Sequence, residues 1–553
     1  MSDPALDIPG TTRILDERGE VIGSGAAITL VPTPSSDPED PLNWSQTRKN
    51  IHLACVILYT AATALFSSAL YSIYAPLSDS TGLSIDQLNV GTGYSYLFIG
   101  LGTLIFQPAA LAFGKRPVYL VTSLVTAALN IWTVFVQGNG QWIARCLLLG
   151  LFGAPNFSLI EVSIADLFFY HERSWPMGIY VCLLYAGACL GPLLSGYVFE
   201  GMGWQAVIYL SSGLMAIVFL ILFIFLEETN YMRETPPLAA SHQVAETGAS
   251  VAPEDGEKDV ETKQPSAETT LHVPIHIDDR ISTPWHGPRP FTFVKLSPHA
   301  GGIMWRGLVQ PLALFRQPVI IWCGVMYGVY QIYYNRKSPI PIIAALTSGV
   351  LAYDPYDFST GSVGLTFLSP MLATIPGAVL GGFFTDKYTL HQARKNNGIS
   401  EAEHKLKLFI FPAILTPIGL LMIGLGPYYN AHWMVFVVGE WILNLAGPLA
   451  TLLVLTYAFD TYHAIQPRDR TGVHAAVQDC APYLLAIIVI GMIVTFAFNY
   501  AITPWAFEWG FFNFAISAAC IATAFNLTVL VMLKWGKYLR RTGESYYFKV
   551  INW

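Results

Sequence analysis

The chain has 553 residues, of which 53% are hydrophobic and only 12% are charged, and its formal net charge is −7 at pH 7. Soluble proteins carry roughly 25% charged residues, so this chain has too little charge to coat the several soluble domains that its length would otherwise suggest. The composition therefore excludes an ordinary soluble protein and predicts that lipid covers much of the surface.

Long apolar runs recur along the chain, and a membrane-spanning helix takes about 20 such residues. In the first part of the chain they lie near 51–72, 88–110, 117–137, 141–163, 177–198 and 205–226. After a polar gap they resume near 318–335, 359–384, 408–428, 432–459, 476–500 and 506–534. The seventh run is the least sharply bounded, because 339–352 is also apolar, and a re-entrant segment is an alternative there. The pattern predicts an all-α, polytopic membrane protein with twelve transmembrane helices in two six-helix halves.

The polar stretches divide the chain into five segments. We expect an N-terminal tail, a first half, a linker, a second half and a C-terminal tail over 1–50, 51–226, 227–317, 318–535 and 536–553. The first tail lacks the apolar core of a signal peptide. The middle of the linker, 253–270, is rich in charged residues, Ser and Pro without aromatic residues, so it is predicted to be disordered. Aromatic and basic residues in 290–316 favour either a helix on the membrane surface or a helix packed under the bundle.

Basic residues next to the predicted spans indicate the orientation. Lys and Arg accumulate in both tails and in every second loop, whereas none occurs in loops 73–87, 138–141, 199–204, 429–432 and 501–505. Loops rich in Lys and Arg stay on the cytoplasmic side. The asymmetry predicts that both termini and the linker are cytosolic. We expect a multi-pass protein of the plasma membrane, with an organelle membrane such as the vacuolar one as the alternative.

The sequence offers little for metal, cofactor or enzyme chemistry. All seven cysteines lie in apolar runs and none forms a CxxC pair, so we interpret them as buried packing residues. No Walker A loop is present, and no His/Asp or nucleophile cluster lies within a span. We therefore expect no metal, no cofactor, no nucleic-acid partner and no enzymatic activity. The expected partners are a small-molecule substrate, protons and the lipid bilayer, and the chain is expected to be a monomer.

The fifth span contains the run Gly187-Ala-Cys-Leu-Gly191-Pro192-Leu-Leu-Ser-Gly196. Gly187 and Gly191 are about one helical turn apart, so they share a face on which another helix can approach closely. Pro192 leaves a backbone group of the helix without its partner and bends the helix. Ordinary packing of small residues is the alternative interpretation of this run.

Together with eight other short motifs, this run resembles the major facilitator superfamily. Asp37-Pro-Glu-Asp-Pro-Leu-Asn-Trp44 is similar to the signature that precedes the first span in fungal twelve-span drug:proton antiporter-type members. The other similar segments are, in order, 114–119, 166–173, 227–231, 354–358, 382–387, 394–403 and 457–460. The resemblance covers nearly the whole chain outside the linker, and the subgroup that contains yeast histidinol and polyamine transporters is the most similar.

The resemblance implies a major facilitator fold and roles for two groups of residues. It implies a conformational and packing role for Gly187, Gly191, Pro192 and Gly196. It implies gating in the loops for Lys115, Arg116, Asp166, Arg173, Asp386 and Lys387.

The chain departs from the family's pattern at three places. Leu111-Ala112 stands where the loop between spans two and three usually carries Asp-Arg, so its gating charge network is expected to be incomplete. Arg145 lies five rather than four residues before Gly150, and the extra residue rotates it by about 100°, so we expect it not to face the cavity. Phe157 stands where many relatives carry Glu, which weakens the interpretation as a polyamine carrier.

Acidic residues inside spans are costly in lipid and are therefore functional candidates. Asp479 in span eleven and Glu440 in span ten lie deepest in the second half, and Glu161 lies in span four. A buried carboxyl group can load and release a proton near neutral pH, so Asp479 and Glu440 are the leading proton-coupling candidates and Glu161 is the next, with a structural role as the alternative. We expect Asp166 and Asp460, at span ends, to pair with loop arginines or to cap a helix.

Span seven carries Tyr327, Tyr330 and Tyr334 on one helical stripe, with Gln331 beside it. Aromatic walls with a few polar tips suit amphipathic or cationic organic ligands. These four residues and Asn156 of span four are the substrate-cavity candidates. A stripe that only packs against other helices is the alternative.

Three functions are consistent with this sequence. The leading hypothesis is a secondary active transporter, with proton-coupled export of a small organic compound such as a drug or a secondary metabolite. One alternative is an importer of an organic cation such as a polyamine. The other is a membrane nutrient sensor that does not transport, although only 14 residues follow Leu539, which is short for a signalling tail.

Overall fold

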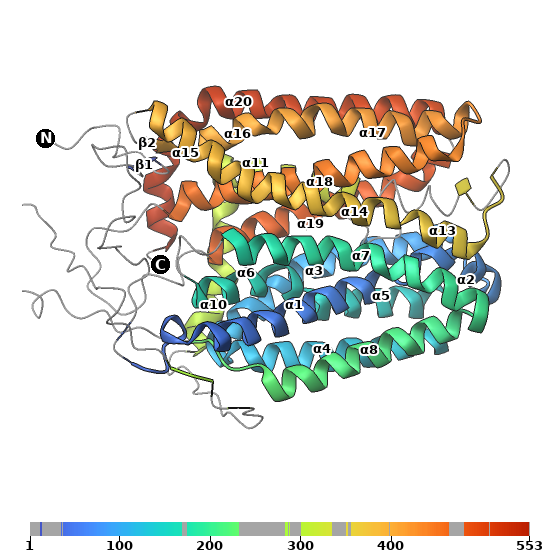
Figure 1. Cartoon of the computed structure of the whole chain (residues 1–553), viewed down its shortest axis with the longest axis horizontal. Coiled ribbons are helices and arrows are strands. Elements are labelled where there is room, and N and C mark those ends of the chain that lie inside the picture. Colours follow the sequence, from blue (N-terminus) through green and yellow to red (C-terminus); the bar gives the residue numbers. More distant parts are fainter. Residues whose placement is uncertain are drawn as a thin grey trace, which may run out of the picture.

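The computed structural model of the chain describes residues 11–13, 35, 37–168, 174–231, 283–285, 287, 300–334, 350–351, 356–396, 399–463, 481–507 and 509–551. Its long helices lie side by side in one elongated bundle (Figure 1). Helix α1 (Gln46–Ser68) begins and helix α20 (Phe511–Ile551) ends at the same end of this bundle. We call this the tail end and the opposite end the loop end.

The first half of the bundle ends at residue 225. Besides α1, its long helices are α3 (Ile85–Phe113), α4 (Lys115–Trp132), α5 (Asn139–Gly153), α6 (Pro155–Leu167), α7 (Ser174–Met202) and α8 (Trp204–Phe225). Its short helices are η1 (Pro41–Asn43), η2 (Tyr71–Ile73), α2 (Tyr74–Thr81) and η3 (Thr133–Phe135). Together α5 and α6 make one crossing that is interrupted at Pro155, which cannot donate a backbone hydrogen bond to the preceding turn.

The first helix of the second half does not run parallel to the long helices of the bundle. Its helices are α10 (Ala300–Ala313), η6 (Leu314–Arg316), α11 (Pro318–Tyr334), α13 (Thr360–Thr366), α14 (Leu368–Val379), the π-helical η7 (Leu380–Phe384), α15 (Thr385–Lys395), α16 (Glu403–Leu406), η8 (Lys407–Phe409), α17 (Ile410–Tyr428), α18 (Trp433–His463), α19 (Ala481–Phe507) and α20.

In the described part of the chain, eleven helices are long and apolar enough to cross a membrane. There are up to twelve if the bent pair Ala300–Arg316 and Pro318–Ile332 makes one crossing. The prediction of an all-α polytopic membrane protein is confirmed. The bent pair coincides with the seventh span, the one that the apolar pattern defines least sharply. Only 350–351 of the apolar stretch 339–352 is described, and the acidic stretch 253–270 lies outside the described residues.

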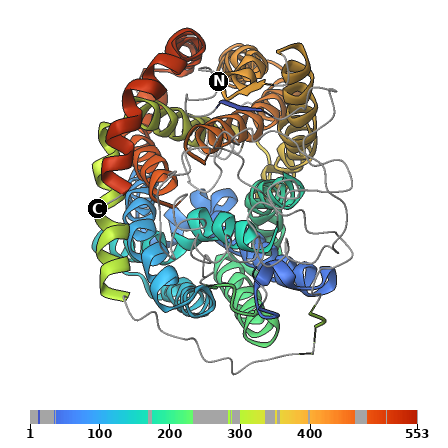
Figure 2. The ribbon, with the colours of Figure 1, turned by 90° about the vertical axis from the view of Figure 1, so that its left-hand side faces the viewer.

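At the tail end, helix α10 runs along one side of the bundle, as seen in Figure 2. A bend of 98° separates it from α11. It contacts α3 of the first half and both α19 and α20 of the second half. Gly307 sits against the ring of Pro108, whereas Trp305 is 67% exposed. The described part of 290–316 packs against both halves, as in the arrangement with a helix under the bundle, and leaves Trp305 exposed.

Two short strands add the only sheet in the described part of the chain. β1 (Thr11–Arg13) pairs antiparallel with β2 (Ile399–Glu401). β1 belongs to the N-terminal tail and β2 to the connection between α15 and α17 in the second half. A segment from the start of the chain therefore lies on the second half, a contact that the sequence pattern did not predict.

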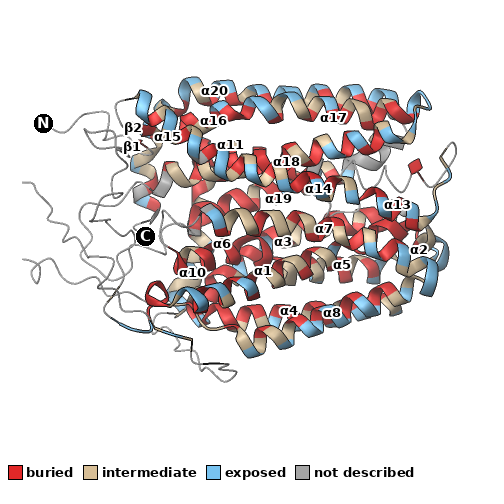
Figure 3. Cartoon of the chain, viewed as in Figure 1, coloured by how far each residue is buried: buried red, intermediate tan, exposed pale blue. Residues whose placement is uncertain are grey.

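The buried apolar residues of the two halves are organised differently. One large core cluster extends through the second half, from Leu314 near its start to Val550 near its end, and also includes Tyr96, Ile99 and Phe157 of the first half. The first half has two separate clusters, one around Tyr119 and one around Trp142. Exposed residues gather on the outward faces of peripheral helices such as α4, α8, α17 and α20 (Figure 3). Many of these are large and apolar, as expected for a surface that faces lipid.

Candidate functional site

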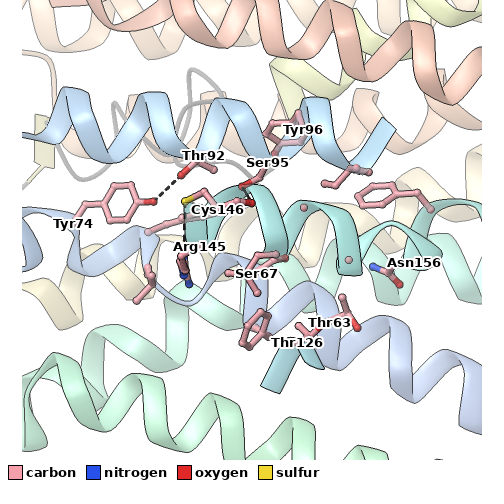
Figure 4. A pocket seen from close by; sticks show the side chains of 18 residues that line it. Thr63, Ser67, Tyr74, Thr92, Ser95, Tyr96, Thr126, Arg145, Cys146 and Asn156 are labelled. Atoms are coloured by element: carbon pink, nitrogen blue, oxygen red, sulfur yellow. Dashed lines mark hydrogen bonds between the residues drawn. The ribbon is translucent and has the colours of Figure 1, made fainter. Parts of the chain in front are cut away.

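A hollow in the first half is lined by residues of the core cluster around Trp142 and by the first-half residues of the large core cluster. Eighteen residues line it, and all of them come from α1 to α6 and their connections (Figure 4). The space between atoms in and around this hollow amounts to about 690 Å³, open solvent included. The lining residues are Thr63, Phe66, Ser67, Leu70, Tyr71, Tyr74, Thr92, Ser95, Tyr96, Ile99, Thr126, Arg145, Cys146, Leu149, Gly150, Gly153, Asn156 and Phe157. We call this hollow the cavity.

Close packing of α5 on α3 forms one wall of the cavity. Gly150 lies directly against the backbone of Ser95, where any side chain at position 150 would collide with it. The Ser95 hydroxyl donates a hydrogen bond of 2.8 Å to the carbonyl oxygen of Cys146. These two contacts fix the rotation of α5 and thereby decide which of its residues reach the cavity.

Arg145 is one of those residues, so the expectation that it faces away from the cavity is wrong. The cavity-lining positions 145, 146, 149, 150, 153, 156 and 157 follow the helical period along α5 and α6. Arg145 and Gly150 stand at opposite margins of this one face. The extra residue between Arg145 and Gly150 therefore places Arg145 at the other margin of the cavity-lining face and does not turn it away from the cavity.

The guanidinium of Arg145 is held by neutral groups. Its Nε donates to Thr133 Oγ1 at 2.8 Å, and Nη2 lies 3.5 Å from Asn130 Oδ1. The guanidinium carbon lies 4.9 Å from the ring centroid of Trp142. Arg145 is only 7% exposed, and no carboxylate pairs with it among the described residues. The cavity therefore has a buried positive charge in its wall.

Some lining side chains carry polar atoms without a hydrogen-bond partner in the described structure. They include the hydroxyl of Tyr71 and the amide of Asn156. A buried polar atom that makes no hydrogen bond costs about 1–3 kcal/mol, so such atoms normally have a partner. Because both side chains border the cavity, water or a polar ligand within it is the natural partner.

Asn156 is the one substrate-cavity candidate from the sequence that lies on this wall. Tyr330 instead donates a hydrogen bond of 2.5 Å to Asn526 Oδ1 on α20 and meets the ring of Phe409 edge-on at 5.6 Å. Tyr327 lies against Gly491 of α19, and Gln331 is buried, but neither lines the cavity. The side chain of Tyr334 is outside the described part of the structure.

The aromatic residues that do line the cavity were missed by sequence reasoning. They are Phe66, Tyr71 and Tyr74 after the middle of the first span and Tyr96 in α3, whereas Phe157 was noted as a departure from the family's pattern. In α3, cavity-lining residues recur at 92, 95, 96 and 99, a helical stripe of hydroxyl and apolar residues. This stripe was the sequence signal that could have identified the cavity wall. Similar stripes elsewhere in the chain, however, only pack against other helices.

Glu161 lies on α6, one helical turn beyond Phe157 toward the tail end. Its side chain is buried, and Oε2 has no hydrogen-bond partner in the described structure. It lies close enough to Tyr180 of α7 and Tyr327 of α11 for electrostatic interaction. Because α11 belongs to the second half, Glu161 is next to the surface where the two halves meet.

The two other proton-coupling candidates lie elsewhere. Glu440 on α18 is 0% exposed and does not line the cavity. Asp479 lies in 464–480, outside the described residues. Of the two candidate acids that the structure describes, Glu161 is the one that it places near both the cavity and the contact between the halves.

Three of the gating candidates, Lys115, Arg116 and Asp166, form a charged corner at the tail end of the first half. Gly114, with a φ of 101°, lets α4 begin immediately after α3. Lys115 pairs with Asp166, and the backbone N–H groups of Lys115 and Arg116 donate to Glu228 at 3.0 and 3.1 Å. A carboxylate at a helix N-terminus is stabilised by the helix dipole.

The expected partner type was wrong for both span-end acids. Asp166 pairs with Lys115, and Asp460 pairs with Lys405 at 2.8 Å, so lysines take the place of the expected arginines. Lys387 is exposed and lies over the ring of Phe383 at 4.2 Å. Arg173 and the side chain of Asp386 are outside the described part of the structure.

The glycine run of α7 makes two different close contacts. Gly187 lies against Ala61 and Gly191 against Leu65 and Ser68, all in α1 of the same half. Gly196 lies against Thr360 and Gly361 at the start of α13, in the other half.

Next to this contact between the halves, the Gly361 N–H donates a hydrogen bond of 2.7 Å to Glu200. Gly364 lies against the carbonyl oxygen of Pro192. The run therefore fixes α7 within its half and also closes the halves together at the loop end.

Comparison with known proteins identifies relatives over most of the chain. The profile of the Major Facilitator Superfamily matches residues 56–478. An uncharacterized MFS-type transporter of Schizosaccharomyces pombe is 26% identical, over 99% of this chain and 95% of that protein. Protein HOL1 of Saccharomyces cerevisiae is 24% identical, over 99% of this chain and 97% of HOL1. The MFS transporter fsa7 of a Fusarium species is 24% identical, over 84% of this chain and 85% of fsa7.

Solved structures show the same fold at low sequence identity. The proton:xylose symporter XylE bound to 6-bromo-6-deoxy-D-glucose matches with a TM-score of 0.56 and 12% identity, over 89% of this chain and 97% of XylE. XylE from E. coli in a partially occluded, inward-open conformation matches with a TM-score of 0.55 and 12% identity, over 89% of this chain and 98% of XylE. At this identity the likeness establishes the fold alone.

Proposed function

Because the chain belongs to the major facilitator superfamily, and is therefore a multi-pass membrane transporter and not an enzyme, we propose that it exports a small organic compound in exchange for protons. The compound binds in the cavity of the first half, and Glu161 carries the proton. We also propose that the tail end faces the cytosol, as the distribution of basic residues predicts, and that the chain acts as a monomer in the plasma membrane.

The position of Glu161 is the observation that carries this proposal. A carboxyl group in a low-dielectric site is more stable when neutral, so a buried Glu161 holds its proton until water reaches it. Movement of the two halves against each other changes which groups face Glu161, since Tyr327 comes from the other half. Proton binding at Glu161 is in this way coupled to the arrangement of the halves.

Similarity to fungal proteins supports the assignment to a group within the superfamily. The relative fsa7 is named as an MFS transporter from a Fusarium species, and HOL1 is similar over nearly its whole length. We propose that this chain belongs to the fungal drug:proton antiporter-type group within the superfamily, as its short motifs indicate. Its substrate is then a drug or a secondary metabolite.

Import of an organic cation is the less favoured alternative. A cationic substrate in the cavity would be repelled by Arg145, which is buried there without an acidic partner in the described structure. Phe157, which stands where many relatives carry Glu, also lines the cavity. The wall therefore presents a cation and an aromatic ring where a polyamine would need carboxylates.

Transport by the purified chain in proteoliposomes tests the proposal. A panel of labelled drugs and metabolites is supplied with and without an imposed pH gradient. We expect the gradient to drive accumulation of at least one compound by the wild type. Glu161→Gln should abolish accumulation but keep exchange down the compound's own gradient, because it removes the titrating group and preserves size and polarity.

The other candidate acids provide the comparison for this experiment. Glu440→Gln and Asp479→Asn should keep pH-driven accumulation if Glu161 carries the proton. If instead Glu161→Gln keeps it and one of the other two loses it, the proton binds in the second half. If no compound in the panel is moved, a sensor without transport becomes the better description.

A further inference from the structure

The buried cations in the described part of the chain differ in their partners. Arg48 bonds to Glu227 at 2.6 Å, Arg540 bonds to Glu403, and Lys115 pairs with Asp166. Arg145 is buried to a similar extent, but its contacts are a hydroxyl, an amide, a thiol and an indole ring. A buried charge without a counter-charge is strongly unfavourable, whereas the same charge next to an anion is stable.

The contacts of Arg145 hold its side chain without neutralising it. Thr133, Asn130 and Trp142 fix the guanidinium in place, and Figure 4 shows Arg145 beside Cys146 on the cavity wall. Among the described residues no acid lines the cavity. A planar guanidinium suits a carboxylate or phosphate because it donates two parallel hydrogen bonds.

We propose that Arg145 binds an anionic head group of the transported compound, so that the substrate class is an organic acid with an aromatic or apolar body. This inference rests on the proposed function, since it takes the cavity as the substrate site. The chemistry shared by such head groups is a carboxylate, sulfonate, phosphate or enolate.

Other residues of the cavity complete the match to an organic acid. The Tyr71 hydroxyl is close enough to interact electrostatically with Arg145 and has no other hydrogen-bond partner in the described structure, so it provides a second donor for the head group. Phe66 and Phe157 form apolar walls for the body. The Asn156 amide remains for a polar group at the far end of the body.

The test uses probe sets in which one aromatic body carries three different heads. Examples are 2-naphthoate, 2-naphthamide and 2-naphthylmethylamine, with equivalent sets on indole, biphenyl and alkyl bodies. The affinity of the purified full-length chain for each probe is measured by its concentration-dependent shift of the melting temperature, in chloride-free buffer. Binding stabilises the folded chain in proportion to the logarithm of ligand concentration over the dissociation constant, so no pH gradient is needed.

We expect the carboxylate member of at least one set to bind best and the ammonium member worst. Arg145→Gln should weaken carboxylate binding by about 10- to 100-fold, because a charge-assisted hydrogen-bond pair is lost, and should leave the carboxamide nearly unchanged. Arg145→Lys should be intermediate. Arg541→Gln, which removes an exposed arginine at the tail end, should leave all affinities as in the wild type.

Several outcomes would overturn the proposal. They are equal binding of the three heads, an unchanged carboxylate preference in Arg145→Gln, no carboxylate binding in any set, and an effect reproduced by chloride alone. If Arg145→Gln does not fold, Arg145→Lys and Tyr71→Phe carry the test, since both should lower carboxylate affinity selectively. Selective acid binding without pH-driven accumulation would overturn proton coupling and leave the head-group assignment standing.

Discussion

The two halves of the bundle bury their polar groups in different ways. In the second half, one continuous core surrounds buried side chains such as Tyr330, whose hydroxyl is bound by Asn526. In the first half, Arg145, Tyr71 and Asn156 border the cavity, whose wall also includes Tyr96, Ile99 and Phe157 of the large core cluster. The comparison shows that similar runs of apolar residues place polar side chains inside a packed core in the described part of one half and along a cavity in the other.

The corners of the two halves at the tail end show a second contrast. In each half a lysine pairs with the acid at the end of the fourth span of that half, Lys115 with Asp166 and Lys405 with Asp460. Beyond the sixth span the signs are reversed. Acidic Glu228 binds the start of α4 in the first half, whereas basic Arg540 binds acidic Glu403 in the second half. Both halves therefore have a charge contact at corresponding positions, but the sign of the charged residue beyond the sixth span differs between them.

The largest effect is expected where a helix has no room for a side chain. Gly191→Leu should disable transport and lower the melting temperature, because a side chain there meets the backbone of Leu65 and the hydroxyl of Ser68. Gly213→Leu is the matched control, since a side chain at this position in the same half meets nothing. Transport assays and thermal unfolding of both variants check this. Normal transport by Gly191→Leu at normal abundance would show that the glycine run is ordinary packing.

A smaller effect is expected at the buried ion pair of the second half. Arg540→Gln leaves Glu403 buried without its cation, since the two side chains are 0% and 9% exposed. Loss of one partner of a buried pair costs about 3–5 kcal/mol, which should appear as a large fall in the melting temperature. Arg541→Gln changes the neighbouring exposed arginine and should cost less than about 0.5 kcal/mol. Equal effects of the two variants would contradict the assigned burial.

The smallest effect is expected at the exposed pair beside it. Lys537 lies 2.8 Å from Glu401, and their side chains are 41% and 26% exposed. Lys537→Gln should therefore cost no more than about 1 kcal/mol, and salt should remove the difference from the wild type.

The pH dependence of this pair has a definite sign. Partial burial by itself raises the pKa of Glu401, but the hydrogen bond and the charge of Lys537 outweigh it and hold the pKa below its usual value. A carboxylate with a lowered pKa stabilises the folded chain at neutral pH, and this contribution is lost as the pH falls through the folded-state value. The melting temperatures of wild type and Lys537→Gln should converge in acid. A difference that persists there would assign the effect to packing of the lysine side chain.

The membrane-spanning helices and the class of protein could be predicted because they depend on local composition. A span needs about 20 apolar residues whatever its neighbours are, so the runs in the sequence coincide with the helices. Glu161 and Asn156 could be singled out for a similar reason, since polar groups in apolar runs are costly and are kept for a purpose. Gly191 was recognised because the spacing of glycines along a helix is itself a local pattern.

The cavity and its chemistry depended on how helices rotate and pack against one another, which no local pattern contains. Arg145 was expected to face away from the cavity, but the contact of Gly150 with Ser95 sets the rotation of α5 and turns Arg145 into the wall. Tyr330 and Tyr71 are aromatic residues in similar runs, yet one packs in a core and the other borders the cavity. The sequence by itself determined which segments cross the membrane, because that is a matter of transfer into lipid. The tertiary structure decided which side chains meet, because the rotation of each helix is settled by contacts with residues distant in the chain.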